Sequence, residues 1–382
     1  MKSSRVASVD ILRGAVMVLM AIDHVRVYAG VPPGGPDPAV FFTRWVTHFC
    51  APVFIFLAGT SAYLVGQNRS SRTALSKWLV TRGLFLVLIE LTLLRFFWTF
   101  NADWQNFTFA GVIWVIGWCM VIMSALVWLP FVAIAAIGTL VVFGHNAVGS
   151  PIREFAARMD GGIEAFIALI YAGGAFGLTD NGPRLVVLYT IIPWIGVMAL
   201  GYAFGAVLRM EAGRRDRICM LIGGAAVALF VLLRATRTYG DPWAWESGLL
   251  SFLGTAKYPA SLQFLLMTLG PAILLVPVLE KARGRVVEWL TVFGKVPFFY
   301  YLVHIPLIHL VAIGVSAVRT PGSTGWLFAN HPMMPPDVLQ GYMWSLPLLY
   351  AITAVVVLLL YPLCRWYARV KETSRSPMVR LL

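Results

Sequence analysis

Long apolar runs separated by short polar segments dominate the chain. A helix needs about 20 apolar residues to cross the hydrocarbon core of a bilayer, and ten runs come close to that length. The pattern therefore predicts an all-α, polytopic integral membrane bundle of about ten transmembrane helices, which form a single domain over residues 1–382. The predicted spans are 9–28, 41–65, 78–100, 107–127, 130–146, 184–208, 216–235, 259–280, 288–313 and 342–362.

The amino-acid composition agrees with this pattern. Of the 382 residues, 59% are hydrophobic and only 12% are charged, whereas globular chains carry about 25% charged residues. These values exclude a disordered chain and an ordinary cytosolic enzyme. The four cysteines are scattered through apolar runs, without the spacing of a zinc site or a disulfide scaffold.

The placement of the charges predicts an orientation. A net charge of +13 would suggest a nucleic-acid partner in a soluble protein. If the N-terminus is cytoplasmic, however, 17 of the 30 lysines and arginines fall in inner segments and 7 in outer ones. This bias fits the positive-inside rule, so we expect both termini in the cytoplasm and no nucleic-acid partner. The outer loops would be 29–40, 147–183, 236–258 and 314–341, with an interfacial or re-entrant helix over 163–177.

Ionisable residues are densest in the first predicted span, where each is costly to bury and therefore a candidate for function. Arg13 and His24 are eleven positions apart. At 3.6 residues per turn they share one helix face, about 16 Å apart along the axis. Gly14 lies beside Arg13 on nearly the same stripe. The structural alternatives are an Arg13–Asp10 pair and an Asp23–Arg26 pair, the latter at i,i+3 spacing.

Three histidines are placed in the middle or outer parts of their predicted spans. His24, His48 and His304 would meet if their helices were neighbours. Three histidines also suggest a metal site, but no two have the i,i+4 spacing of a helical metal site, so we expect no metal.

Two other patterns indicate packing. Glu90 is a carboxylate deep in the third predicted span, where we expect it to neutralise a buried arginine, Arg13 or Arg95. The run Gly201–Gly205 is a small-xxx-small pattern, which is typical of close helix contacts.

Several motifs resemble one family of membrane enzymes. The segments Ser8–Gly14, Pro52–Ser61, Ile192–Gly196, Phe293–Gly294 and Tyr301–His304 resemble, in this order, the catalytic membrane domain of heparan-alpha-glucosaminide N-acetyltransferases and their bacterial relatives. The Arg13-x10-His24 spacing is also similar to that of bacterial membrane acyltransferases that decorate surface glycans. One departure is that the loop after the first span, where the heparan enzymes have their proposed active histidine, contains none here.

The resemblance implies a transmembrane N- or O-acetyltransferase in the bacterial cytoplasmic (inner) membrane. It would move an acetyl group from cytoplasmic acetyl-CoA to an amine or hydroxyl of a sugar or glycan on the far side. His24 would be the catalytic base, with Asp23 or His48 to orient it. Direct transfer and an acetyl-histidine intermediate both remain open.

The remaining site residues are assigned on the same basis. Arg13, with Asp10 and Gly14, would bind the acyl-CoA donor, and Arg26 and His304 would bind the acceptor. The expected partners are membrane lipid, acyl-CoA and a glycan acceptor, and a homodimer is left open.

Two other functions compete with the enzyme. A proton-coupled small-molecule transporter also uses intramembrane charges, although we find no repeated halves of the kind that such carriers often show. The third alternative is a non-catalytic membrane component of glycan assembly.

Overall fold

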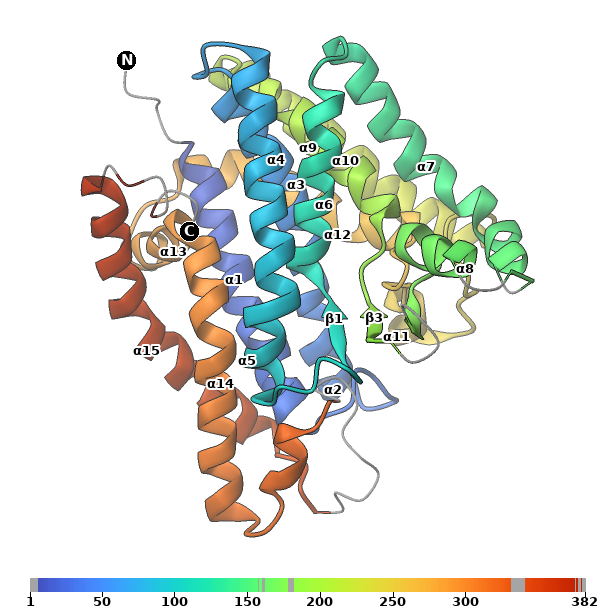
Figure 1. Cartoon of the computed structure of the whole chain (residues 1–382). Coiled ribbons are helices and arrows are strands. Elements are labelled where there is room, and N and C mark those ends of the chain that lie inside the picture. Colours follow the sequence, from blue (N-terminus) through green and yellow to red (C-terminus); the bar gives the residue numbers. More distant parts are fainter. Residues whose placement is uncertain are drawn as a thin grey trace. The chain divides into compact units, whose positions relative to one another are not determined.

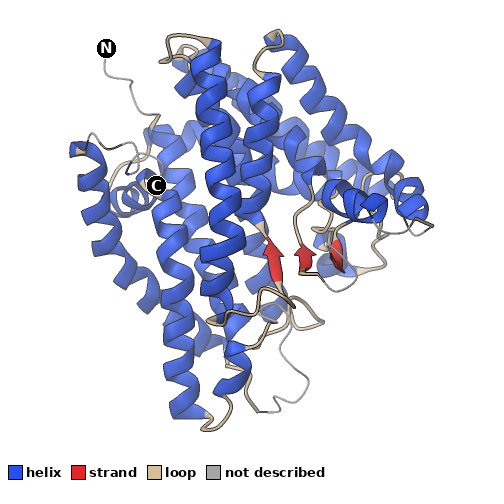
Figure 2. Ribbon diagram, in the orientation of Figure 1, coloured by secondary structure: helices blue, strands red, loops and turns tan. Residues whose placement is uncertain are grey.

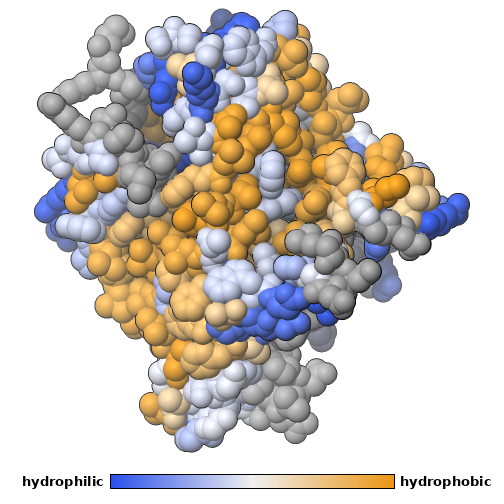
Figure 3. Space-filling view, in the orientation of Figure 1, coloured by the Kyte–Doolittle hydropathy of each residue, from blue (hydrophilic) through white to orange (hydrophobic). Residues whose placement is uncertain are grey.

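The computed structural model describes residues 6–156, 158–159, 162–177, 182–330, 341–374, 376 and 379. Its ribbon is mainly helical (Figure 2). Among the described residues, seven helices are long and apolar enough to cross a membrane, and exposed apolar side chains cover much of the face in Figure 3. The prediction of a polytopic helical membrane protein is confirmed. The seven segments are Pro38–Gly66, Phe131–Ile152, Ile191–Leu208, Ala212–Thr236, Leu262–Lys281, Pro297–Arg319 and Leu346–Thr373.

The chain divides into two compact units, which are described separately here. Unit 1 comprises Met1–Val6, Ala51–Thr92 and Trp104–Val278, and unit 2 comprises Ala7–Cys50, Leu93–Asp103 and Leu279–Leu382. The helices and strands that lie wholly or mainly in unit 1 are α3 (Cys50–Gly66), α4 (Arg72–Ile89), η2 (Glu90–Leu94), β1 (Thr108–Ala110), α6 (Val112–Leu126), α7 (Phe131–Ala156), α8 (Gly162–Ile167), η3 (Ala168–Ala172), β2 (Gly174–Gly177), β3 (Arg184–Val187), α9 (Ile191–Leu208), α10 (Ala212–Thr236), α11 (Gly248–Leu253) and α12 (Leu262–Lys281). Those of unit 2 are α1 (Ala7–Tyr28), α2 (Pro38–Trp45), η1 (Val46–Phe49), α5 (Arg95–Thr99), α13 (Arg285–Lys295), α14 (Pro297–Arg319), η4 (Thr324–Phe328) and α15 (Leu346–Thr373).

Glycines bring the helices of unit 1 into backbone contact. A Cβ on Gly201 of α9 would lie 1.9 Å from the Phe56 carbonyl oxygen of α3, and a Cβ on Gly205 would lie 2.6 Å from the Cβ of Tyr63. Thr60 adds a hydrogen bond to the Gly201 oxygen (2.9 Å). Small residues permit this close approach, so the packing role predicted for Gly201–Gly205 is confirmed. Helices α4 and α6 also run side by side in unit 1 (Figure 1).

A small sheet lies in unit 1 where the sequence predicts only helix. Its strands are ordered β1-β3-β2, with β1 parallel and β2 antiparallel to β3, and Figure 2 shows them as short arrows. The predicted spans 107–127 and 184–208 therefore begin with strands, and their helices start only at Val112 and Ile191. Segment 163–177 forms the short helices α8 and η3 and then strand β2. Its predicted location at the membrane surface stays a prediction.

In unit 2, helix α1 packs against α13 and α14. The contact with α13 again relies on glycines, because a Cβ on Gly14 would lie 1.9 Å from the Leu290 oxygen and a Cβ on Gly294 would lie 1.8 Å from the Asp10 oxygen. The span predicted over 288–313 begins too early, because the candidate span is α14, Pro297–Arg319, and α13 is a separate helix. The helix breaks at Val296, whose φ is −131° and ψ 49°, and Pro297 begins the next helix, a position where its missing N–H is tolerated.

Candidate active site

Two histidines meet in the interior of unit 2. His24 lies on α1 and His304 on α14, and the His24 Nδ1 is 2.6 Å from the His304 Nε2. His24 is 8% exposed and His304 is fully buried. The two rings stack with their centroids 4.8 Å apart. Two of the three histidines singled out in the sequence are therefore in direct contact.

Aromatic rings and backbone oxygens surround this histidine pair. The edge of Trp98 faces His24 at a centroid distance of 4.8 Å, and Tyr301 packs against both imidazoles. On the other side, the His304 Nδ1 lies 2.6 Å from the Tyr301 carbonyl oxygen and 3.1 Å from that of Tyr300. Both imidazoles are therefore held in fixed orientations in a largely apolar environment.

Asp23, next to His24 in the sequence, forms an ionic cluster with two arginines. Its Oδ1 accepts from the Arg26 Nε (2.9 Å) and its Oδ2 accepts from the Arg44 Nη1 (2.5 Å). Arg26 also donates to the Val31 oxygen (2.7 Å). Of the two pairs considered from the sequence, the Asp23–Arg26 pair is thus present, and the carboxylate of Asp23 also links α1 to α2.

His48 lies in η1 of unit 2 and is half-buried. The buried hydrogen-bond partner of the His24 Nδ1 is His304, which the sequence assigns to acceptor binding. The described residues contain no group of three or more histidine, cysteine, aspartate or glutamate side chains placed to hold a metal ion.

The residues assigned to the donor lie near the start of α1. The Arg13 Nη1 is 3.8 Å from the Asp10 Oδ1, with both side chains mostly buried, so this pair is also present. Gly14 faces the Leu290 backbone, and its lack of a side chain is explained by helix packing. A role for these three residues in donor binding stays a prediction.

The expectation for Glu90 is wrong. Its Oε1 accepts a hydrogen bond from the Gly111 N–H (3.1 Å), and within the described ranges no ion pair joins it to Arg13 or Arg95. Gly111 precedes α6, where backbone N–H groups lack partners and carry a partial positive charge, so a carboxyl oxygen fits there. Arg95 instead donates to backbone oxygens, including that of Asp103 (2.5 Å).

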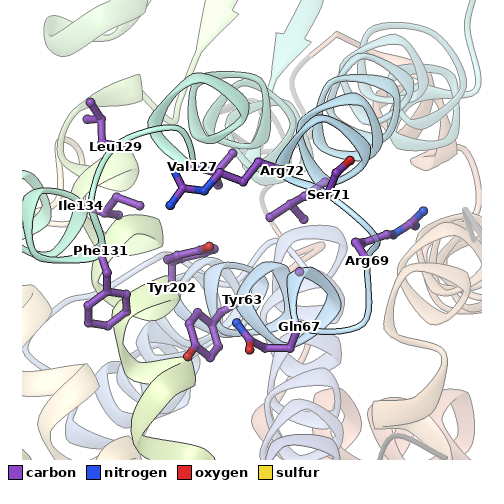
Figure 4. Close-up of a pocket in the computed structure, with 12 residues that line it drawn as sticks. Tyr63, Gln67, Arg69, Ser71, Arg72, Val127, Leu129, Phe131, Ile134 and Tyr202 are labelled. Atoms are coloured by element: carbon purple, nitrogen blue, oxygen red, sulfur yellow. The ribbon is translucent and has the colours of Figure 1, made fainter. Parts of the chain in front are cut away.

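Unit 1 contains a cavity of about 410 Å³ among α9 and the connections that follow α3 and α6. In Figure 4, Arg72 lies across this cavity from Tyr63 and Gln67. Arg69 and Tyr202 also line it. The sequence identifies the arginines as cations of a predicted inner loop. It gives no signal that α9 would bring Tyr202 to them, because 130 residues separate Tyr202 from Arg72.

Comparison with known families gives one match. The model of the family heparan-alpha-glucosaminide N-acetyltransferase, catalytic, matches residues 5–254. No curated protein matches the chain. The family match includes Arg13, His24 and the cavity residues but ends before Phe293–Gly294 and Tyr301–His304, two of the segments that carry the resemblance in the sequence. Because the match covers well over half of the chain and these helices suit a membrane, the protein belongs to the heparan-alpha-glucosaminide N-acetyltransferase catalytic family, which indicates a membrane acetyltransferase.

Proposed function

We propose that this protein transfers an acetyl group from cytoplasmic acetyl-CoA to an amine or hydroxyl of a sugar or glycan on the far side of the bacterial cytoplasmic membrane, with His24 as the base. The observation that carries the proposal is the contact of 2.6 Å between His24 and His304. Imidazole is suited to proton transfer near neutral pH, and general bases are commonly oriented by a hydrogen-bonded partner.

The proposed reaction is a direct acyl transfer. The His24 imidazole takes the proton of the acceptor N–H or O–H as the acceptor atom forms a bond to the thioester carbonyl carbon. The carbon–sulfur bond then breaks and CoA leaves as a thiolate, which is neutralised by the proton that His24 has taken. The histidine is regenerated, and no oxidant, reductant or metal enters the balance.

Two groups of cations are candidates for the donor phosphates. Arg13 lies on the same helix as His24, toward the predicted inner surface. Arg69 and Arg72 line the cavity of unit 1, in a segment that the charge bias also assigns to the cytoplasm. Arginine is well suited to phosphate, and a cavity of about 410 Å³ falls within the ordinary range for ligand sites.

The test is acetyl transfer by purified protein in liposomes, with radiolabelled acetyl-CoA and a glucosamine-type acceptor. We expect His24→Gln to lower kcat by about 10²–10⁴-fold, the usual contribution of a general base, while the protein still inserts and folds. His145→Gln is the matched control, because His145 is a buried histidine of unit 1 that contacts backbone oxygens.

Undiminished transfer by His24→Gln would remove His24 from the reaction. If the wild-type protein moves solutes but neither transfers nor hydrolyses the acetyl group of acetyl-CoA, the transporter alternative replaces the enzyme.

A further inference from the structure

The structure supports a role for His304 that differs from acceptor binding. Its side chain is fully buried, whereas His24 retains 8% exposure. A side chain that contacts the base but has no exposed surface lies on the buried side of the base, where the acceptor does not reach it. This inference rests on the function proposed above, because it concerns the residue that orients the base of that reaction.

The protonation of His304 follows from its backbone neighbours. Its Nδ1 faces the carbonyl oxygens of Tyr301 and Tyr300 at 2.6 and 3.1 Å. A carbonyl oxygen only accepts hydrogen bonds, so Nδ1 must carry the hydrogen. In a neutral imidazole the other nitrogen is then an acceptor, and this assigns the lone pair of His304 to Nε2.

The protonation of His24 follows in turn. The His304 Nε2 lone pair faces the His24 Nδ1 at 2.6 Å, and a contact of this length between two nitrogens needs one hydrogen between them. His24 must supply it, so His24 carries hydrogen on Nδ1, and in the neutral imidazole its lone pair is then on Nε2.

The opposite arrangement would place a hydrogen on both nitrogens of His304 and make it an imidazolium. His304 has no exposed surface, and its contacts are His24, aromatic rings and the two backbone oxygens. An ion in such a site needs a charged partner to offset the loss of solvation, and no carboxylate in the described part of the chain pairs with His304. The neutral arrangement is therefore favoured.

We propose that His304 is a positioning residue that fixes the tautomer of His24, so that the base of the reaction is the His24 Nε2. His304 accepts the His24 Nδ1–H, as a carboxylate orients the histidine of a hydrolase triad, but without burying a negative charge. Trp98 and Tyr301 limit rotation of the His24 ring, so its Nε2 keeps one direction.

The kinetic test compares two substitutions of His304. His304→Leu removes the acceptor, and we expect kcat to fall by about 100-fold or more with little change in KM for acetyl-CoA, because an untethered His24 samples the wrong tautomer. His304→Gln places a side-chain oxygen near the former Nε2, and we expect it to recover kcat to within about tenfold of wild type, the smaller loss typical of an outer-shell change.

His309→Leu is the matched control. His309 is fully buried on the same helix, its nitrogens face the backbone oxygens of Phe97 and Leu327, and its ring stacks on Phe100. A loss of activity caused only by damage to α14 should be equal in His309→Leu and His304→Leu and should not be rescued by glutamine. That result would overturn the proposal.

A spectroscopic measurement separates this inference from the proposed function. In wild-type protein with ¹⁵N-labelled histidine, His24, identified by its loss in His24→Gln, should show a protonated Nδ1 and an unprotonated Nε2. His304→Gln should keep this signature, and His304→Leu should lose it. A protonated Nε2 in the wild type would overturn the inference even if the enzyme is active, and the measurement stands even if no acetyl transfer is found.

Discussion

Asp23 and His24 are neighbours on α1, but they belong to opposite kinds of polar cluster. Asp23 is an ion with both oxygens held by guanidinium groups of Arg26 and Arg44. His24 belongs to a histidine pair, in direct contact with His304 at 2.6 Å, for which we propose a neutral state with a lone pair on the His24 Nε2. Consecutive residues of a helix point about 100° apart, so one turn presents a structural ion network on one side and a group capable of proton transfer on the other. Both residues are costly to bury, so the cost of burial alone does not distinguish an ion network from a pair of histidines.

The largest expected effect tests the structural side of this comparison. Asp23→Asn should lower the free energy of unfolding by about 3 kcal/mol, because removing one partner leaves two mostly buried guanidinium groups without their carboxylate. The measurement is denaturant or thermal unfolding in detergent. The kcat of the fraction that remains folded should be nearly unchanged. A large loss of kcat at normal stability would instead make Asp23 part of the reaction.

A smaller effect is expected where α1 meets α13. Gly14→Ala should destabilise the protein by about 1–3 kcal/mol, as overpacking does, because the added Cβ would overlap the Leu290 oxygen. Gly294→Ala introduces the same overlap from α13, and Gly224→Ala is the control, with no atom within 4 Å of its added Cβ. If Gly14→Ala alone also raises KM for acetyl-CoA, Gly14 contacts the donor; equal behaviour of Gly14→Ala and Gly294→Ala assigns it to packing.

The smallest effect concerns the cavity of unit 1. If Arg72 binds a donor phosphate, Arg72→Gln should raise the dissociation constant of acetyl-CoA by about tenfold, the value of one hydrogen bond to a charged group. Lys77→Gln on the same helix removes the same charge from an exposed side chain outside the cavity. Titration of both variants with acetyl-CoA distinguishes a direct contact of Arg72 with the donor from the general positive charge of the predicted cytoplasmic segment. Identical constants for the two variants would leave the cavity without a donor role.

The sequence was informative wherever the signal was local. Apolar length predicted membrane helices, the small-xxx-small run predicted a close helix contact, and i,i+3 spacing predicted the Asp23–Arg26 pair. His24 was singled out because an ionisable group inside an apolar helix is costly, and its role in the reaction stays a prediction. Each of these features depends on residues within a few turns of one another.

The sequence was incomplete or wrong where the outcome depended on distant residues or on backbone geometry. His24 and His304 were expected to meet only if their helices were neighbours, and because they lie 280 positions apart, periodicity contains no information on whether they are. An arginine was predicted as the partner of Glu90 because opposite charges attract, but its hydrogen-bond partner is the backbone N–H of Gly111. The break before Pro297 had a local signal, since proline restricts the residue before it, but the mostly apolar sequence of 288–313 obscured it.

That break has a consequence for the chemistry. If α13 and α14 were one straight helix, the glycine contact between α13 and α1 would also set the direction of the segment that carries His304. Because the helix is interrupted at Val296, α13 packs its backbone against the start of α1. Helix α14 runs in a different direction, which brings His304 to His24 near the C-terminal end of α1. The contact between the two imidazoles thus relies on a change of backbone direction at Val296, a residue that offers no chemical group to the reaction.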